Sequence, residues 1–490
     1  MKIKVIILFF LFPAFGYSQT DTIAHLHAYG GGNNDVAEEI EATIDGGYII
    51  IGSTSSNSSG NTDAYLLKVD SNCGYQWSYA LGGINNDWGY SVKQTFDKGY
   101  IIGVSSNSYG NGGYDACLMK RDSLGNYEWK KCYGGNDWDL VYSVAQTHDS
   151  GYVFCGETYN NTNGFSDVFV VKTNQLGDTI WTRTVGGALV DKGNSIIETT
   201  DSNIVVAGVK NTLVDSTQIY VLKFDFNGTL LWDSVYGDSL YENLNQIIQT
   251  ADGDYAMVGS TNSLSTGGDQ DYLIKKISSN GNWLWDFTIV NGPSPTPQDE
   301  EALALVELSN NYLLISGYSM TGANSKNIAF FQLKPDGNWA GVSSVYSSVN
   351  DDLVNSVSIG MGGSILGAGL TMSFGSGLED VLLIKLDTIY SGQDTSMTGY
   401  PDMIPLNVNN KYIGSEINVF PNPVKDKFEI DLKNLERIGH ITLYDITGQI
   451  VYSKDYFDEE IDISHLTKGI YLLVVNPGEN ERFQTKIIKY

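Results

Sequence analysis

A repeat of about 52 residues is the feature that most limits how this chain can fold. Six tryptophans recur near that spacing, beginning with Trp77 and Trp129 and ending at Trp339. An alternating apolar segment precedes each of them, as in DAYLLKVD at 63–70, and a seventh such segment, DVLLIKLD at 380–387, has no tryptophan after it. Each copy also holds a Gly-containing loop, a turn such as DGGY at 45–48 and a second apolar run. The chain therefore contains seven copies of a unit of four short strands.

Seven four-stranded units are typical of a β-propeller, because a ring gives every unit two neighbours against which to bury its faces. An open β-solenoid is the alternative, and the chain ends discriminate between the two. The seventh copy lacks its last strand, while DTIAHLHAYGG at 21–31 matches GDTIWTRTVGG at 177–187. An N-terminal strand that completes the last blade removes two exposed sheet edges. The sequence therefore predicts an all-β fold with a seven-bladed propeller over 19–389, closed by an N-terminal strand.

The first residues have the pattern of a secretory signal peptide. A basic start at 1–4 precedes an apolar run at 5–15, and the small residues Gly16 and Ser18 predict cleavage before Gln19. We therefore expect 1–18 to be a signal peptide and the mature chain to be exported. No other apolar run reaches the ~18 residues that a spanning helix needs, so no transmembrane segment is predicted.

The charge of the chain limits its binding partners, and its cysteine content limits its disulfides. The chain has 29 basic and 57 acidic residues, a formal net charge of -28, which repels phosphate backbones and makes nucleic acid a poor partner. It has four cysteines. A bridge between Cys117 and Cys132, on two predicted strands joined by a turn, is conceivable, but mostly unpaired packing thiols are the interpretation that so few cysteines favour.

A second unit follows the repeats. Residues 390–416 lack the repeat and are rich in Gly, Pro, Asn and Ser, which predicts a linker. From Ile417 the chain runs INVFPNPVKDKFEIDL, HITLYDITGQIVY and EIDISHLTKGIYLLVV to its end. Short strands with Gly-containing turns predict a small β-sandwich over 417–490.

This last segment resembles the type A C-terminal sorting domain of Bacteroidetes cargo for the type IX secretion system. The matching residues are Pro421, Asn422, Pro423, Asp445, Gly448, Gly469, Tyr471, Lys486 and Lys489. The resemblance implies translocation across the outer membrane, recognition by the secretion machinery and removal of the tail by a sortase-like protease. It implies a product that passes through the periplasm and is secreted or attached to the outer-membrane surface. The repeats resemble uncharacterised propeller-like arrays upstream of such tails.

One acidic position recurs in every copy, where the innermost strand of each blade is expected to begin. It is occupied by Asp35, Asp87, Asp139, Asp191, Glu242, Glu300 and Asp352. As a ring at the channel mouth, these acids could hold a cation such as Ca2+ or a cationic ligand. Alternatively, each accepts backbone N–H bonds from the adjacent Gly loop, and sevenfold recurrence favours this structural role. No cofactor is predicted otherwise.

A candidate ligand site lies in the loops of the second and third blades. Trp88 and Trp138 fall outside the tryptophan repeat, beside polar residues that can bind sugar hydroxyls while an indole stacks on the ring face. The neighbouring candidates are Asn86, Asp87, Asn136, Asp137, Tyr109 and Tyr159. The alternative is that both indoles fold inward and cover the blades.

The sequence contains no GxSxG elbow, P-loop or HExxH motif. His25 and His27 share one face of the closing strand, but no third metal ligand is evident. Two hypotheses follow. The first is a non-catalytic exported propeller that binds a glycan or a surface protein. The second is a polysaccharide-active glycoside hydrolase with an acidic pair on the loop face, although nothing in the sequence selects that pair.

Overall fold

The computed structural model describes residues 4–7, 23–56, 58, 61–160, 162, 164–213, 216–237, 240–262, 269–290, 299–320, 325–347, 350–386, 393–396, 402–405, 417–420, 424–432, 440–444, 450–455, 461–478 and 481–489. Contacts divide the chain into two compact units, Met1–Asn407 and Val408–Tyr490. The predicted limits of the signal peptide, propeller, linker and tail stay predictions.

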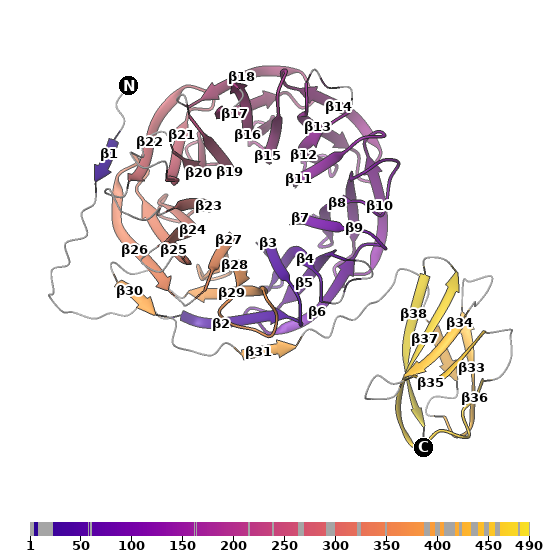
Figure 1. The fold of residues 1–490 in the computed structure, drawn as a ribbon. Coiled ribbons are helices and arrows are strands. Elements are labelled where there is room, and N and C mark those ends of the chain that lie inside the picture. Colours follow the sequence, from indigo (N-terminus) through magenta and orange to yellow (C-terminus); the bar gives the residue numbers. More distant parts are fainter. Residues whose placement is uncertain are drawn as a thin grey trace. The chain divides into compact units, whose positions relative to one another are not determined.

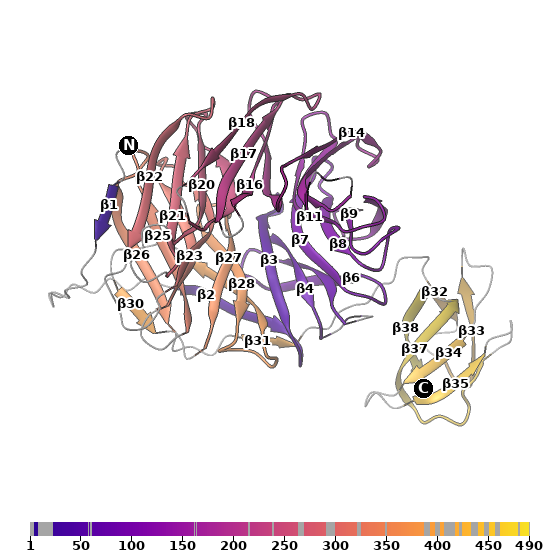
Figure 2. The ribbon, with the colours of Figure 1, turned by 45° about the horizontal axis from the view of Figure 1, so that its top comes forward.

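The first unit is a ring of seven blades (Figures 1 and 2). Each blade is an antiparallel sheet whose strands follow one another from the central channel to the rim. Blade one contains β3 (Asp35–Ala42), β4 (Tyr48–Thr54), β5 (Asp63–Val69) and β6 (Tyr75–Leu81). Blade two contains β7 (Asp87–Gln94), β8 (Tyr100–Ser106), β9 (Asp115–Arg121) and β10 (Tyr127–Tyr133). Blade three contains β11 (Asp139–Gln146), β12 (Tyr152–Thr158), β13 (Asp167–Thr173) and β14 (Thr179–Val185).

The remaining blades follow the same order. Blade four contains β15 (Asp191–Glu198), β16 (Ile204–Leu213), β17 (Ser216–Phe224) and β18 (Leu230–Tyr236). Blade five contains β19 (Glu242–Gln249), β20 (Tyr255–Thr261), β21 (Asp271–Ile277) and β22 (Trp283–Val290). Blade six contains β23 (Glu300–Glu307), β24 (Leu313–Met320), β25 (Lys326–Leu333) and β26 (Trp339–Ser347). Blade seven contains β27 (Asp352–Ile359), β28 (Ile365–Thr371), β29 (Asp380–Leu386) and the N-terminal β2 (Ile23–Gly30).

The repeat builds one core between each pair of blades. The second and third strands of a blade, such as β4 and β5, are buried along their whole length because both faces meet a neighbour. The repeated tryptophans pack across these joints: the ring of Trp77 lies 5.8 Å from Tyr100 of blade two, and that of Trp129 lies 5.8 Å from Tyr152 of blade three. They therefore serve the scaffold.

The N-terminal strand closes the ring, as the sequence predicts. β2 pairs antiparallel with β29, placing His27 opposite Leu383. Blade seven then meets blade one, where the Ile40 backbone N–H donates to Ser356 Oγ at 3.2 Å and the Ala42 N–H donates to Ser358 Oγ at 3.0 Å. The all-β, seven-bladed propeller is confirmed.

Three short strands add to blade edges. β1 (Lys4–Ile7), within the predicted signal peptide, runs parallel to β22. β30 (Gln393–Ser396) runs parallel to β26, and β31 (Asp402–Pro405) runs parallel to β2. Both lie in the stretch that the sequence predicts as a linker.

A β-bulge in every inner strand shapes the channel. The pairing register shifts by one residue between Ala37 and Glu39 in β3 and at the matching place in the other six inner strands. The extra residues are Glu38, Tyr90, Tyr142, Asn194, Asn245, Leu303 and Asn355. A bulge redirects the side chain at the extra position, and all seven of these residues line the channel.

The residue after the bulge joins two blades at six of the seven joints. Glu39 Oε2 accepts from the Val92 N–H at 2.8 Å, and Ser91 Oγ accepts from the Val144 N–H at 3.1 Å. The same bond recurs at four more joints, from Ile196 to Ser143, Ile247 to Ser195, Leu305 to Gln246 and Ile40 to Ser356. Ala304 has no acceptor in its side chain, so the joint between blades six and seven lacks this bond. We call the set the channel belt.

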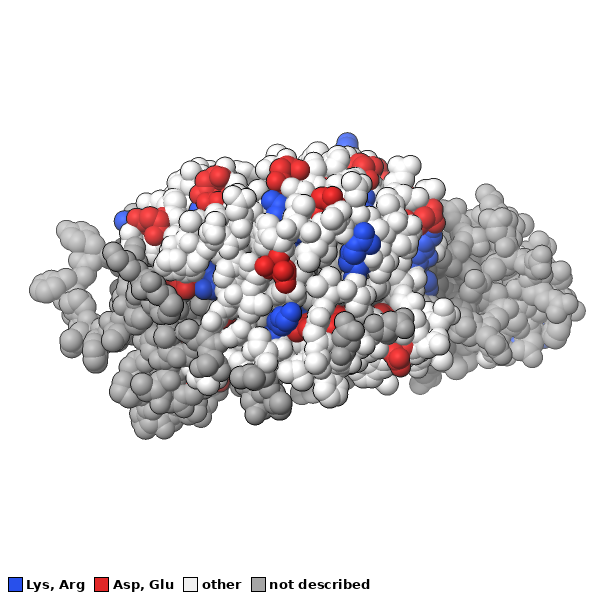
Figure 3. Space-filling view, turned by 90° about the horizontal axis from the view of Figure 1, so that it is seen from above, with Lys and Arg blue, Asp and Glu red and all other residues white. Residues whose placement is uncertain are grey.

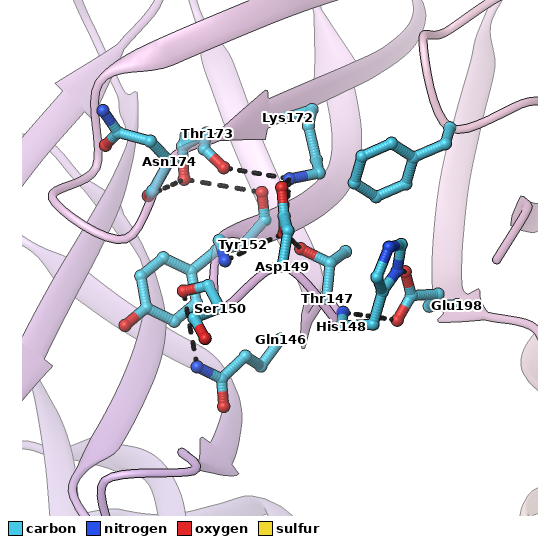
Figure 4. A network of polar contacts seen from close by, with 12 residues as sticks. Gln146, Thr147, His148, Asp149, Ser150, Tyr152, Lys172, Thr173, Asn174 and Glu198 are labelled. Carbon is cyan, nitrogen blue, oxygen red and sulfur yellow. Dashed lines mark hydrogen bonds and ion pairs between the residues drawn. The ribbon is translucent and has the colours of Figure 1, made fainter.

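The turn opposite the loop face is built around an ion pair between a buried lysine and a partly exposed aspartate, shown for blade three in Figure 4. Lys172 Nζ lies 2.9 Å from Asp149 Oδ2, and the same carboxylate accepts from Thr147 Oγ1 at 2.6 Å and from the Gly151 N–H at 3.0 Å. Lys172 is on β13 and Asp149 in the turn between β11 and β12, so the pair lies within one blade. Recurrence of this lysine predicts a scaffold contact between blades, and two copies make one: Lys223 Nζ donates to the Tyr255 hydroxyl of blade five at 3.1 Å, and Lys385 Nζ of blade seven donates to the Ser71 carbonyl of blade one at 2.6 Å.

The cysteines divide into two kinds. Cys117 on β9 and Cys132 on β10 are directly opposite each other and form a disulfide. Cys73 and Cys155 are buried free thiols. The expectation of mostly unpaired thiols thus holds for these two and is wrong for the Cys117–Cys132 pair.

The second unit contains two sheets. The first has β32 (Ile417–Phe420), β33 (Lys427–Leu432) and β36 (Ile461–Asp462). The second has β35 (Ile450–Asp455), β34 (His440–Tyr444), β37 (Gly469–Gly478) and β38 (Glu481–Lys489). Phe428 of the first sheet and Leu443 and Leu473 of the second share one apolar cluster. The sandwich itself stays a prediction.

We predict that the closing strand is essential to stability. A chain that starts at residue 30 loses β2 and exposes the edge of β29, so its melting temperature should fall by about 10 °C or more relative to a chain that starts at residue 19. Thermal unfolding followed by circular dichroism measures the difference. Equal melting temperatures would show that β2 does not close the ring.

We also predict an acid-sensitive turn. Although burial favours the neutral acid, bonds from Thr147, Lys172 and Gly151 lower the pKa of Asp149 below its usual 3.8. This contribution is present above about pH 4 and is lost as the pH falls below that value. Asp149→Asn should therefore cost about 1–2 kcal/mol of unfolding free energy at pH 7, since it leaves the Lys172 ammonium without its counter-charge. Unfolding curves of variant and wild type should converge near pH 2; a pH-independent gap would contradict the ionic role.

Candidate functional site

An aromatic cluster occupies the loop face of blades two and three. The Trp138 indole lies edge-on to Tyr114 at 5.5 Å and to Tyr159 at 6.1 Å between ring centroids. Trp88 Nε1 donates to the Tyr114 hydroxyl at 3.4 Å. Trp138 is 51% exposed, although it is held by two rings. We call Trp88, Tyr114, Trp138 and Tyr159 the loop-face cluster.

The local backbone makes room for the exposed indole. A Cβ on Gly113 would lie 2.2 Å from the Trp138 ring, so only glycine permits this approach. Below the indole, the Asn136 and Asp137 N–H groups both donate to Asn160 Oδ1, at 3.0 and 3.2 Å. These bonds fix the loop backbone and leave the side chains of Asn136 and Asp137 exposed.

The structure brings together only some of the predicted ligand residues. Trp138 and Tyr159 are joined, and Trp88 reaches them through Tyr114, although Trp88 lies within β7 rather than in a loop. Tyr109 is held apart, because its hydroxyl donates to the Gly82 carbonyl at 2.6 Å and its ring faces Lys130. The Asn86 carbonyl accepts from the Asn107 N–H at 3.0 Å.

Sequence reasoning missed Tyr114, which connects the cluster. Tyr114 stands directly before the repeated Asp115, where other copies have Thr62, Ser166 or Gln270. An aromatic residue at a position that is otherwise polar was the available signal.

The recurrent acids lie buried beneath the Gly loops. Asp87 Oδ2 accepts from the Gly83 N–H at 2.8 Å and from Ser108 Oγ at 2.6 Å. Asp139 Oδ2 likewise accepts from the Gly135 N–H at 2.8 Å and from Asn160 Nδ2 at 2.6 Å. Burial raises the pKa of Asp139 even though these bonds oppose it. The set is Asp35, Asp87, Asp139, Asp191, Glu242, Glu300 and Asp352, and each member is buried.

The described side chains form no evident metal centre. Within the described ranges, no three His, Cys, Asp or Glu side chains lie together as a ligand set. The rings of His25 and His27 are stacked with centroids 5.9 Å apart, and His27 continues the stack toward Tyr29 at 6.0 Å. These histidines therefore belong to a stack on the closing strand.

The tail residues have structural roles where they are described. Tyr471 is buried, and its hydroxyl donates to the Thr467 carbonyl at 2.6 Å. Lys489 Nζ donates to the carbonyls of Lys425 at 2.7 Å and Ile463 at 2.9 Å, which ties the last strand to the other sheet's connections. Gly469 begins β37 and Lys486 lies on β38. Pro421, Asn422, Pro423, Asp445 and Gly448 lie outside the described residues.

Comparison with known proteins assigns the tail. Residues 418–490 match the family model of the secretion system C-terminal sorting domain. The chain is therefore a β-propeller exported through the type IX secretion system, with a cell-surface or secreted location. No helix in the described part of the chain has the length and apolar character to cross a membrane.

Curated relatives match over a short stretch. The endo-acting ulvan lyase of Formosa agariphila is 28% identical over 82 residues, 16% of this chain and 16% of the lyase. Ulvan lyase NLR42 of Nonlabens ulvanivorans is 30% identical over 86 residues, 17% of this chain and 16% of the lyase. The matches thus span about a sixth of each relative.

A solved structure with a similar arrangement is PorZ, a surface component of the type IX secretion system of Porphyromonas gingivalis. It is 12% identical, with a TM-score of 0.42 over 94% of this chain and 60% of PorZ.

We predict that the tail is separable from the propeller. A chain ending at residue 416 should fold with an unchanged propeller melting temperature. It should remain in the periplasm, because it lacks the domain that the secretion machinery recognises. Surface proteolysis and immunoblotting of the culture medium measure delivery, with the full chain as the control. Normal delivery of the shortened chain would contradict this role of the tail.

Proposed function

We propose that the propeller is a surface binding module that holds a glycan on the loop-face cluster. The exposure of Trp138 carries this proposal. A large indole held by rings at its edges, with much of its surface in solvent, is poised to stack on a flat apolar surface.

A sugar ring fits this surface. Its C–H face packs on an indole, and its hydroxyls exchange hydrogen bonds with neighbouring amide and carboxylate groups. Asn136 and Asp137 supply such groups beside Trp138. Tyr159, 36% exposed, offers a second ring and a phenol within the same cluster. A protein surface that presents a planar polar group is the alternative partner, and the same test distinguishes it.

The charge of the chain favours a neutral glycan. With a net charge of -28, the protein repels polyanions at moderate salt. The side of the ring in Figure 3 has scattered basic and acidic side chains on a mostly uncharged surface, with no basic patch for an anionic polymer.

A polysaccharide-degrading enzyme is the alternative. The ulvan lyases named above share with this chain a stretch about as long as the 418–490 tail, which supports a shared export route more than shared chemistry. The recurrent acids are buried, and those of blades one to four accept backbone N–H bonds from the Gly loops, so these acids are not exposed as a pair for acid–base catalysis.

A glycan array probed with the mature chain tests the proposal. Trp138→Ala should weaken binding at least about tenfold through loss of stacking, with little change in melting temperature because the indole is exposed. Trp283→Ala is the matched control, since Trp283 is 37% exposed on the outer strand of blade five. Repeating the array with Ca2+ and with a chelator shows whether the ion takes part.

Equal binding by wild type and Trp138→Ala would overturn the site. Release of shortened sugars from bound glycans would favour the enzyme alternative instead.

A further inference from the structure

The central channel contains a cavity of about 100 Å3 at the level of the inner-strand bulges. It is open rather than enclosed, so a ligand can enter without movement of a lid. The strands around it, β3, β7, β11, β15, β19, β23 and β27, surround the centre of the ring in Figure 1. Its bulge residues differ from blade to blade, whereas scaffold positions repeat. This variation indicates that the cavity wall has a role other than holding the scaffold together.

Four bulge residues from consecutive blades form one arc of the wall. Asn355 of blade seven donates from Nδ2 to the Ala37 carbonyl at 2.9 Å, which leaves its amide oxygen and its second N–H available. Glu38 of blade one follows. Tyr90 of blade two and Tyr142 of blade three come next, with ring centroids 5.3 Å apart and edge-to-face.

The Tyr142 hydroxyl is already bonded to another side chain. Its hydroxyl donates to Glu157 Oε1 at 2.6 Å, and Ser166 Oγ donates to the other oxygen of Glu157 at 2.8 Å. The arc therefore presents an amide oxygen, a carboxyl group and aromatic rings, a combination that favours positive charge.

Burial in the channel raises the pKa of Glu38 to about 7. The charged groups nearby leave it without a counter-ion: Lys93 is engaged by Glu39 and Glu41. On β7 and β11 the titratable groups at this level are the phenols of Tyr90 and Tyr142.

The other elements around the arc add no free cation. On β27, Asn355 and Ser356 carry no charge. On β15, Lys192 Nζ lies 6.0 Å from the Tyr142 ring centroid, on the far side of the arc from Glu38. No hydrogen bond joins the Glu38 carboxyl to another side chain of the described channel wall.

We propose that this cavity binds a small organic cation with an ammonium head, held by the Glu38 carboxylate, the Asn355 amide oxygen and the face of Tyr90. The ammonium supplies the positive charge that Glu38 lacks, and its N–H groups donate to the two oxygens. Its carbon stem points along the open channel. The site is separate from the loop-face cluster and does not depend on the proposed glycan function.

Size and ligand set select this class of ligand. An engineered cavity of about 150 Å3 accepts benzene, so about 100 Å3 holds an ammonium with a short stem but not a sugar ring. A divalent metal ion such as Ca2+ takes six to eight oxygen ligands, usually with several carboxylates. Two carboxylates, Glu38 and Glu39, line this cavity, and Glu39 is already engaged by Lys93 and the Val92 N–H. An inorganic anion would meet a carboxylate and two aromatic faces and is repelled.

Binding should be linked to the protonation of Glu38. The ammonium binds the ionised carboxylate, so affinity should fall about tenfold for each pH unit below 7 and level off above it. Isothermal titration of the full chain with ethylammonium chloride from pH 5 to pH 8 measures this profile. At pH 6, titration in two buffers of different ionisation enthalpy should reveal release of nearly one proton per ligand.

Glu38→Gln keeps the shape of the side chain and removes its charge, and it should weaken ethylammonium binding at least tenfold at pH 8. Glu128→Gln, on the outer strand β10, is the matched control and should bind as wild type. If Glu38→Gln fails to fold, the wild-type pH profile still decides. Binding that is independent of pH, no detectable binding at pH 8, or equal binding of ethanol would each overturn the proposal. Displacement of ethylammonium by stoichiometric Ca2+ would show a metal site instead.

Discussion

The channel belt is the interaction on which the ring depends. An inner strand has no further strand on its channel side, and its backbone N–H groups would remain unbonded at a sheet edge. At six of the seven joints, the belt satisfies one of these groups with a side chain of the neighbouring blade, as Ser91 does for Val144 and Ser356 does for Ile40. The bond fixes the spacing of these adjacent blades, including blades seven and one, where β27 meets β3 and the circle closes.

The same bulge creates the scaffold bond and the variable wall of the channel. The residue after the bulge is usually Ser and carries the belt, whereas the bulged residue itself faces the channel and is free to differ. Asn is used where the side chain also reaches the next blade, as Asn194 does with the Leu244 carbonyl at 2.6 Å. Glu38 and Tyr90 make no such bond, and the cavity has its distinctive chemistry there. The residue that varies in the channel wall and the residue that bonds to the next blade are thus neighbours along the strand.

The architecture could be predicted from the sequence because it depends on features that recur. Because the strand pattern occurs in seven copies, a segment that is ambiguous in one copy can be assigned from the others. The match of 21–31 to 177–187 identifies the closing strand without any side-chain geometry. The same holds for the export tail, where residues such as Gly469 and Tyr471 occur in a fixed order. Recurrence in six copies likewise indicates that the tryptophan at position 77 serves packing, in agreement with its contact with Tyr100 of blade two.

What the sequence could not predict depends on single contacts between blades. Nothing local shows that Tyr114 bridges Trp88 and Trp138, because the three residues come from two different blades and meet only after the loops are placed. The bulges were equally hidden, since one extra residue in β3 leaves the apolar pattern around Ile40 intact. The pairing of Lys172 with Asp149 was also hidden, because spacing along the chain does not distinguish the turn of the same sheet from that of its neighbour.

The arrangement of lysines bears on the ligand classes that we propose for this acidic chain. In five blades the repeated lysine is buried against the turn aspartate of its own sheet, as Lys68 is with Asp45 and Lys120 with Asp97. These pairs are neutral and hold five of the 29 basic residues against the blades. The excess of acids is then left to the loops, the channel and the surface, where it repels polyanions and attracts positive charge. The stacking that we propose for the loop-face cluster would be insensitive to that field, whereas the cation binding that we propose for the Glu38 cavity would make use of it.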